Sequence, residues 1–128
     1  MMYLVDANIF LEILLSQERQ EACKRFLVMA IGNICISDFS LHSIGVILFR
    51  NNKENIFQKF AKDVIPKVRI VTLSKESYKD LVEIRNKLEL DFDDAYQYKV
   101  ANDYNLEIVT MDNDFKKVKR DIKVIFLK

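Results

Sequence analysis

The chain has 128 residues, half of them apolar and 30% charged, with only two glycines and one proline. This composition excludes a disordered or low-complexity chain, and the length suits one folded domain over residues 1–128. The formal net charge of +1 gives no argument for a polyanionic partner. Basic residues crowd positions 116–128, where a solvated surface is the simpler interpretation and a phosphate-binding strip the alternative.

Cysteine usage and hydropathy bear on the cellular compartment. Cys23 and Cys35 do not form a CxxC motif, and His42, the single histidine, cannot complete a zinc site with them. Asp6 interrupts the first apolar run too early for a signal peptide, and no apolar run is long enough to span a bilayer. We therefore expect a soluble, cytoplasmic protein with two buried, reduced thiols and no membrane partner.

The first half of the chain predicts two rounds of one strand followed by two helices. Short apolar runs predict buried strands, and apolar side chains at helical spacing predict helices. The expected strands are residues 2–5 and 34–36, and the expected helices are residues 9–15, 16–30, 39–50 and 54–64. The helix over residues 39–50 is nearly all apolar and should therefore be buried.

The second half continues the alternation. The expected strands are residues 69–73, 107–110 and 123–127, and the expected helices are residues 74–88 and 92–105, with a turn or short helix over residues 113–115. Strands that alternate with helices favour an α/β fold, in which helices cover both faces of a central, mostly parallel sheet of about five strands.

Aspartates stand at the ends of the predicted strands. Asp6 follows the first strand, Asp38 the second and Asp112 the fourth. The carboxyl ends of parallel strands share one edge of the sheet, where open α/β sheets bind ligands, so these three should share that edge. The helix that begins near Asp94 should start at the same edge. For Asp6 alone, helix capping and metal binding remain equally open.

Three further acids, Asp91, Asp93 and Asp94, lie within four residues. Asp91 is a natural N-cap, and acids in a first turn suit the helix dipole, but capping does not readily explain all three. Carboxylates without histidine or thiolate partners suit Mg²⁺ or Mn²⁺ rather than zinc. Such an ion can activate water and neutralise charge on a phosphodiester. The lack of a glycine-rich loop argues against a Walker or Rossmann nucleotide site.

Three segments together resemble the PIN domain family, which includes the VapC-type toxin ribonucleases and related metal-dependent nucleases. They are residues 4–8 (LVDAN), residues 93–95 (DDA) and residues 108–115 (IVTMDNDF), the last similar to the family's T-x-D-x-D-F signature. They occur in the family's order and span nearly the whole chain. The resemblance implies a PIN-like three-layer α/β/α domain that acts as a Mg²⁺- or Mn²⁺-dependent endoribonuclease.

The resemblance also implies roles for particular side chains. The catalytic metal ligands would be Asp6, Asp94 and Asp112. Asp114 would be a further metal-binding or auxiliary acid, Asn8 and Thr110 would support the ligands, and Asp93 would be a substitute for Asp94.

One position departs from the family pattern. The glutamate that the family usually carries on the helix after the second strand is missing, and its expected position falls near Ser43. Asp38 or His42 would have to fill the role, and either would change the geometry. A lone histidine among apolar neighbours is more simply a hydrogen-bonded structural residue. A site without this acid would bind metal more weakly, cleave slowly or mainly hold RNA.

The resemblance further implies that the chain cleaves RNA as the toxin of a type II toxin–antitoxin pair. A small antitoxin would neutralise it, and a homodimer is expected. One alternative is a non-toxin nuclease of RNA processing or DNA repair. Another is a domain with lost catalysis that binds RNA or protein and whose carboxylates are only helix caps. A receiver-like phosphoacceptor domain fits less well, because it would need a lysine after its last strand.

Overall fold

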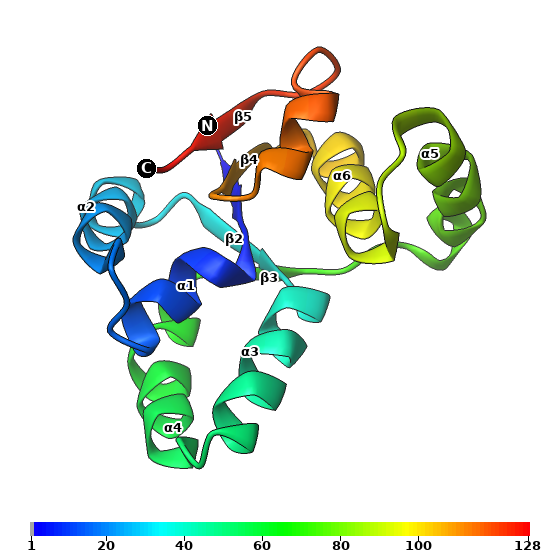
Figure 1. The fold of residues 1–128 in the computed structure, drawn as a ribbon. Helices are drawn as coiled ribbons and strands as arrows, with labels where there is room; N and C mark the ends of the chain where they lie inside the picture. Colours follow the sequence, from blue (N-terminus) through cyan, green and yellow to red (C-terminus); the bar gives the residue numbers. More distant parts are fainter. Residues whose placement is uncertain (1) are drawn as a thin grey trace.

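A five-stranded parallel sheet forms the middle layer of the fold (Figure 1). It is seen in a computed structural model that describes residues 2–128. The strands are β1 Tyr3–Val5, β2 Ile34–Ser37, β3 Arg69–Val71, β4 Glu107–Thr110 and β5 Val124–Phe126. Their order across the sheet is β3-β2-β1-β4-β5, and every neighbouring pair is parallel. The predicted α/β fold with a parallel sheet of about five strands is confirmed.

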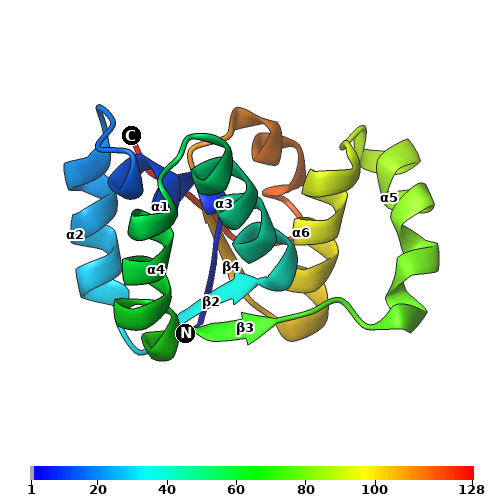
Figure 2. The same cartoon turned by 90° about the horizontal axis from the view of Figure 1, so that it is seen from below.

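Helices cover both faces of this sheet. The α-helices are α1 Ala7–Leu14, α2 Gln20–Ala30, α3 Asp38–Arg50, α4 Glu54–Asp63, α5 Leu81–Leu88 and α6 Phe92–Tyr104. Three short 3-10 helices join them: η1 Ile65–Lys67, η2 Lys75–Asp80 and η3 Asn113–Val118. Figures 1 and 2 show α1 to α4 gathered on one side and α5 with α6 on the other.

Successive residues of one strand enter two different cores. Leu4 and Ile108 pack into the core that α5, α6 and η3 cover, whereas Val5 and Val109 pack into the core of α1 to α4. Neighbouring side chains of a strand point to opposite faces of a sheet. The uninterrupted apolar runs of the sequence therefore arise because the central strands are buried on both faces.

The chain reverses its direction across the sheet at β1. The path from β1 through β2 to β3 moves one way, and the connection through α5 and α6 then returns to place β4 on the other side of β1. Right-handed crossovers in opposite directions put their helices on opposite faces. The ends of β1 and β4 are thus the point where open α/β sheets leave a crevice for a ligand.

Several predicted boundaries differ from the observed ones, and three of the predicted elements need correction. The helix expected over residues 16–30 begins only at Gln20, because the chain turns at Ser16, whose φ is 53°. The strand expected over residues 69–73 ends at Val71. The helix expected over residues 74–88 consists of η2 followed by α5. Ser74 occupies the N-cap position of η2, but its hydroxyl donates to the Ser77 hydroxyl and makes no capping hydrogen bond.

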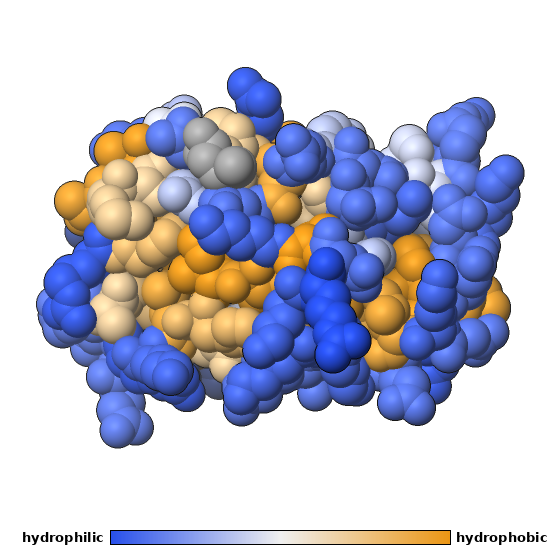
Figure 3. Space-filling view, turned by 90° about the horizontal axis from the view of Figure 1, so that it is seen from above, coloured by the Kyte–Doolittle hydropathy of each residue, from blue (hydrophilic) through white to orange (hydrophobic). Residues whose placement is uncertain are grey.

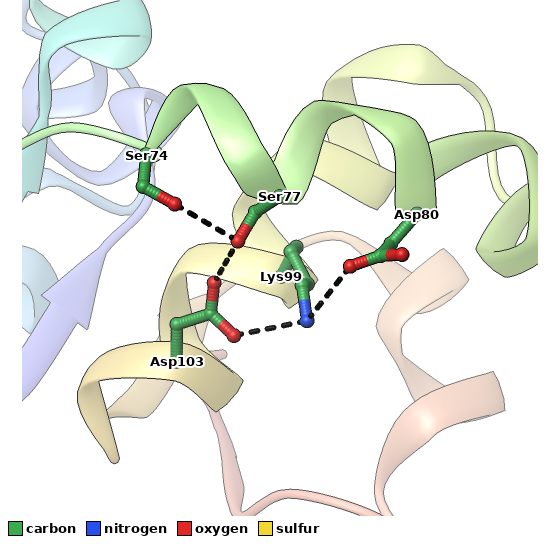
Figure 4. Close-up of polar contacts among 5 residues, drawn as sticks. All are labelled: Ser74, Ser77, Asp80, Lys99 and Asp103. Atoms are coloured by element: carbon green, nitrogen blue, oxygen red, sulfur yellow. Dashed lines mark hydrogen bonds and ion pairs between the residues drawn. The ribbon is translucent and has the colours of Figure 1, made fainter.

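A polar network joins η2 to the outer side of α6 (Figure 4). The Ser77 hydroxyl donates to the Asp103 carboxylate at 2.7 Å, and Lys99 lies 3.0 Å from Asp103 and 3.6 Å from Asp80. Exposed ion pairs contribute little each, but this network spans two elements and fixes how η2 lies along α6.

Helix α3 is buried on one side only, so the prediction of a buried helix was wrong. Its buried residues are Ser40, Ile44 and Leu48, whereas Phe49 is 56% exposed and His42 is exposed. The helix packs against α1, α4 and β2, and its opposite side meets solvent. His42 is therefore a surface residue and not a structural histidine held among apolar side chains.

The two thiols behave as expected from the sequence. Cys23 and Cys35 are both buried and free, and they lie in different cores. Burial raises the pKa of both thiols, which keeps them neutral and unreactive.

Strand β5 forms one edge of the sheet, and its residues are half-buried. The face of the molecule above it carries apolar side chains bordered by hydrophilic ones (Figure 3). Lys123, just before the strand, lies 3.0 Å from the carboxylate of Glu107 on β4. Charged side chains of this kind discourage pairing of an edge strand with another chain.

Within residues 2–128, none of the helices has both the length and the apolar character needed to cross a membrane.

Candidate metal centre

Asp6 and Asp112 follow the two strands at the reversal point of the sheet. Asp6 occupies the N-cap position of α1, but its side chain makes no capping hydrogen bond. It accepts instead from the Thr110 hydroxyl, with 2.8 Å between the oxygens. The backbone N–H of Asp112 donates to the same hydroxyl oxygen at 2.9 Å. Thr110, fully buried at the end of β4, therefore ties the two aspartates together across adjacent strands.

Replacing Thr110 by valine should lower the free energy of unfolding by about 1–3 kcal/mol, because it leaves buried polar partners unpaired. Urea unfolding of the protein in a chelator measures this loss. The exposed Thr72→Val variant is the matched control and should change stability by less than about 0.5 kcal/mol. Equal stability of the two variants would show that Thr110 does not tie the aspartates.

Helix α6 brings a third carboxylate to the same place. Asp91 caps this helix, as predicted, by accepting from the backbone N–H of Asp94 at 2.9 Å. This cap fixes the first turn, from which Asp94 extends. Asp94, Asp112 and Asp114 each offer a carboxylate oxygen, and these oxygens lie within 4.8 Å of one another. Asp94 is the most buried of the three and Asp114 the most exposed.

A cavity of about 270 Å³ contains most of these acids. Asp6, Asp94 and Asp112 line it, and the exposed Asn8 and Asp93 also border it. Ser43 of α3 belongs to the lining too. No lysine, arginine or histidine is found among the described residues that line this cavity. The cavity is therefore a concentration of negative charge without a positive side chain.

The pKa values reflect this uncompensated charge. Burial, and then the charges of Asp91, Asp112, Asp6 and Asp114, raise the pKa of Asp94 to about 7. Burial is also the main cause that raises the pKa of Asp6, with Asp112 adding to it and the Thr110 hydrogen bond opposing it. Converging carboxylates of this kind fit a hard divalent cation with oxygen ligands, Mg²⁺ or Mn²⁺, which would supply the missing positive charge.

Asp114 lies on the turn that follows β4. Its backbone N–H donates to Asp112 Oδ1 at 2.9 Å, so the Asp112 carboxylate holds the backbone from which the Asp114 side chain extends. Asp112 is the N-cap of η3, and the fully buried Phe115 anchors that short helix in the core. The D-x-D-F pattern thus combines two acids of the carboxylate cluster with one apolar anchor.

Neither suggested replacement for the missing glutamate lies in the cavity. The Asp38 carboxylate accepts from the Tyr96 hydroxyl at 2.6 Å, and Asp38 is absent from the cavity lining among the described residues. Burial and this hydrogen bond raise the pKa of Tyr96. His42 is exposed and also lies outside the lining. Asp38 does follow β2 and so lies at the expected edge of the sheet. Its carboxylate, however, bonds Tyr96 and does not join the acids of the cavity.

The cavity also contains a residue that the sequence analysis missed. Gln97 is buried in its wall, and its amide Nε2 donates to the Ser40 hydroxyl oxygen at 2.9 Å. One signal in the sequence could have found it. Gln97 follows Asp94 by three residues, and residues three apart lie on the same face of a helix.

A parallel α/β sheet with a carboxylate cluster at its reversal point defines a candidate divalent-cation centre. The sequence profile of the PIN domain matches residues 3–121. The chain belongs to the PIN domain family.

Solved structures share the fold. VapBC2 from Rickettsia felis, bound to a DNA fragment from its promoter, has a TM-score of 0.81 at 19% identity over 100% of both chains. A toxin–antitoxin complex from Klebsiella pneumoniae has a TM-score of 0.76 at 20% identity, over 96% of this chain and 95% of that one. FitAcB from Neisseria gonorrhoeae has a TM-score of 0.76 at 21% identity, over 97% and 96%. No curated protein matches the chain by sequence.

Proposed function

We propose that this PIN domain is a Mg²⁺- or Mn²⁺-dependent endoribonuclease. The observation that carries the proposal is the convergence of carboxylates from three separate segments in a cavity whose described lining has no positive side chain. Asp6, Asp94 and Asp112 are the proposed metal ligands, and Asp114 is a further acid beside them. Close carboxylates repel one another unless a proton or a cation lies between them.

A divalent ion bound there would supply an activated water and neutralise charge developing on a phosphodiester. The protein's own contribution is positioning. The Thr110 hydroxyl orients Asp6, and the Asp112 carboxylate orders the turn that carries Asp114. Asn8, exposed at the cavity, presents a side-chain amide that can donate to a phosphate oxygen. Ser43 leaves the site with one negative charge fewer than the family pattern, which lowers the repulsion of an RNA backbone.

The proposed biological role is that of the toxin of a toxin–antitoxin pair, acting on RNA in the cytoplasm. Two structures with this fold are a toxin–antitoxin complex and VapBC2 bound to promoter DNA. An open groove of about 570 Å³ between α3 and α4 is bordered by apolar side chains that include Leu41, Phe49 and Phe57. It is a surface that a small antitoxin would cover. A homodimer is part of the same proposal.

Purified protein with Mn²⁺ should cleave RNA at least about 100-fold faster than the Asp6→Asn/Asp112→Asn double variant, because each 1.36 kcal/mol of lost stabilisation costs tenfold in rate. Gel analysis of a labelled RNA measures the rates. The Asp63→Asn/Asp121→Asn variant is the matched control: it removes two exposed acids outside the cavity and should cleave at the wild-type rate. Equal rates for wild type and the Asp6→Asn/Asp112→Asn variant would refute the catalytic proposal.

Expression in a bacterial host separates the toxin from its alternatives. Growth arrest that Asp6→Asn abolishes supports the toxin. RNA cleavage without growth arrest favours a nuclease of RNA processing or repair. A saturable Mn²⁺ site without cleavage favours a domain that binds RNA or protein, and the lack of a glutamate near Ser43 is the observation behind that second candidate.

A further inference from the structure

Among the described residues that line the cavity, Gln97 alone combines deep burial with a side-chain polar atom that lacks a hydrogen-bond partner. Its side chain is anchored, since Nε2 donates to the Ser40 hydroxyl oxygen at 2.9 Å. Only 5% of Gln97 is exposed, yet its Oε1 has no hydrogen-bond partner among the described residues. Buried polar atoms nearly always have a partner, so this oxygen indicates a ligand of the cavity.

The chemistry of Oε1 restricts what that ligand can be. An amide oxygen only accepts hydrogen bonds, so its partner must be a donor. The aspartates of the same cavity are acceptors as well when they are ionised, which is the form that binds a cation, and in that form they cannot serve. A cavity of about 270 Å³ has room for water, and water is a donor.

The position of Gln97 links it to the departure from the family pattern. It lies three residues after Asp94 and so on the same face of α6. Its anchor Ser40 belongs to α3, the helix on which the family's glutamate is missing, and Ser43 of that helix lines the same cavity. The Gln97 side chain therefore reaches from α6 to α3, and the described residues of α3 contribute no carboxylate to the lining of this cavity.

We propose that Gln97 Oε1 is an additional oxygen acceptor of the cation site, that it binds a water ligand of the ion, and that Gln97 with Ser40 takes the place of the missing glutamate. This inference rests on the proposed function of the site as a Mg²⁺ or Mn²⁺ centre. Mg²⁺ usually keeps several of its waters in proteins, and such waters need acceptors. A neutral acceptor holds one of them without adding a further negative charge to aspartates that already repel one another.

Calorimetric titration of metal-free protein with MnCl₂ at pH 8 tests the proposal without a cleavage assay. Gln97→Met keeps the length of the side chain and removes the acceptor, and it should raise the Kd for Mn²⁺ by about 10- to 100-fold. Gln97→Glu keeps an acceptor oxygen and should bind Mn²⁺ at least as tightly as wild type. Gln58→Met, at an exposed glutamine of α4, should stay within twofold of wild type.

Two further variants separate the possible failures. Ser40→Ala removes the anchor but keeps Oε1, so the Kd should rise by less than it does for Gln97→Met. If Gln97→Glu, which keeps an acceptor oxygen, binds Mn²⁺ as weakly as Gln97→Met, the side chain acts through packing and the proposal is overturned. Equal Kd values for Gln97→Met and wild type overturn it as well, while Asp112→Asn still abolishes binding. If wild type itself shows no saturable Mn²⁺ site, the proposed function fails together with this inference.

Discussion

The Asp94→Asn variant should be more stable than wild type without metal and at least about 100-fold slower in Mn²⁺-dependent RNA cleavage. Both effects have one cause. Asp94 lies where burial and four other carboxylates disfavour its charge, which raises its pKa to about 7. Asparagine has nearly the same shape as aspartate and no charge. It therefore removes the repulsion that destabilises the metal-free protein, and it also removes a carboxylate ligand of the proposed cation.

The stability effect depends on pH in a defined direction. The pKa of Asp94 is about 7 in the folded protein, against 3.8 for the ordinary side chain. Between these values the folded state binds the proton more tightly, so the unfolding free energy falls as the pH rises from about 4 to about 7. Asparagine mimics the protonated form. The variant should therefore equal wild type near pH 4 and exceed it by about 1–2 kcal/mol at pH 8, a value discounted for partial exposure.

Urea unfolding at several pH values measures this difference, first in a chelator and then with Mn²⁺. Added Mn²⁺ should stabilise wild type and leave the variant unchanged, because a ligand stabilises only the state that binds it. The matched control is Asp103→Asn on the same helix. Asp103 is paired with Lys99 at 3.0 Å, so its replacement should give no gain in stability and no loss of cleavage. An Asp94→Asn variant less stable than wild type at pH 8 in the chelator would contradict the account of repelling carboxylates.

The Phe115→Ala variant should lose about 3–5 kcal/mol of unfolding free energy, the usual cost of deleting a buried phenylalanine ring. Phe115 is 1% exposed and packs in the core that α5 and α6 cover. It lies on η3, the helix that Asp112 caps and that carries Asp114. Loss of the ring should therefore also loosen the turn that positions both acids, and the Kd for Mn²⁺ should rise.

Urea unfolding and Mn²⁺ calorimetry measure the two consequences of Phe115→Ala. Phe92→Ala is the control, because Phe92 is 55% exposed at the start of α6 and should cost less than about 1 kcal/mol. A loss below 1 kcal/mol for Phe115→Ala would show that η3 does not depend on this anchor. Weaker Mn²⁺ binding for Phe92→Ala alone would point instead to the first turn of α6.

The order of strands and helices could be predicted from the sequence because it depends on local patterns. Continuous apolar runs predicted the strands that are buried on both faces of the sheet. Asp6 and Asp112 come just after two of these runs, so the sequence also predicted that they lie at strand ends. Local chemistry also predicted Asp91 as the cap of α6. Each of these features is decided within a few residues of the chain.

The tertiary structure alone decided which side chains meet. Asp38 follows its strand as expected, but its carboxylate accepts a hydrogen bond from Tyr96, which is 58 residues away in the sequence. The burial of α3 on one side only and the anchoring of Gln97 by Ser40 likewise depend on packing between distant segments. The periodicity of the sequence determines on which face of a helix or strand a side chain lies. Which other side chain it contacts depends on how that face packs against another helix or strand. The sequence by itself thus determined the sheet and the edge at which the acids gather, and the packing of α3 against α6 decided which side chains enter the cavity there.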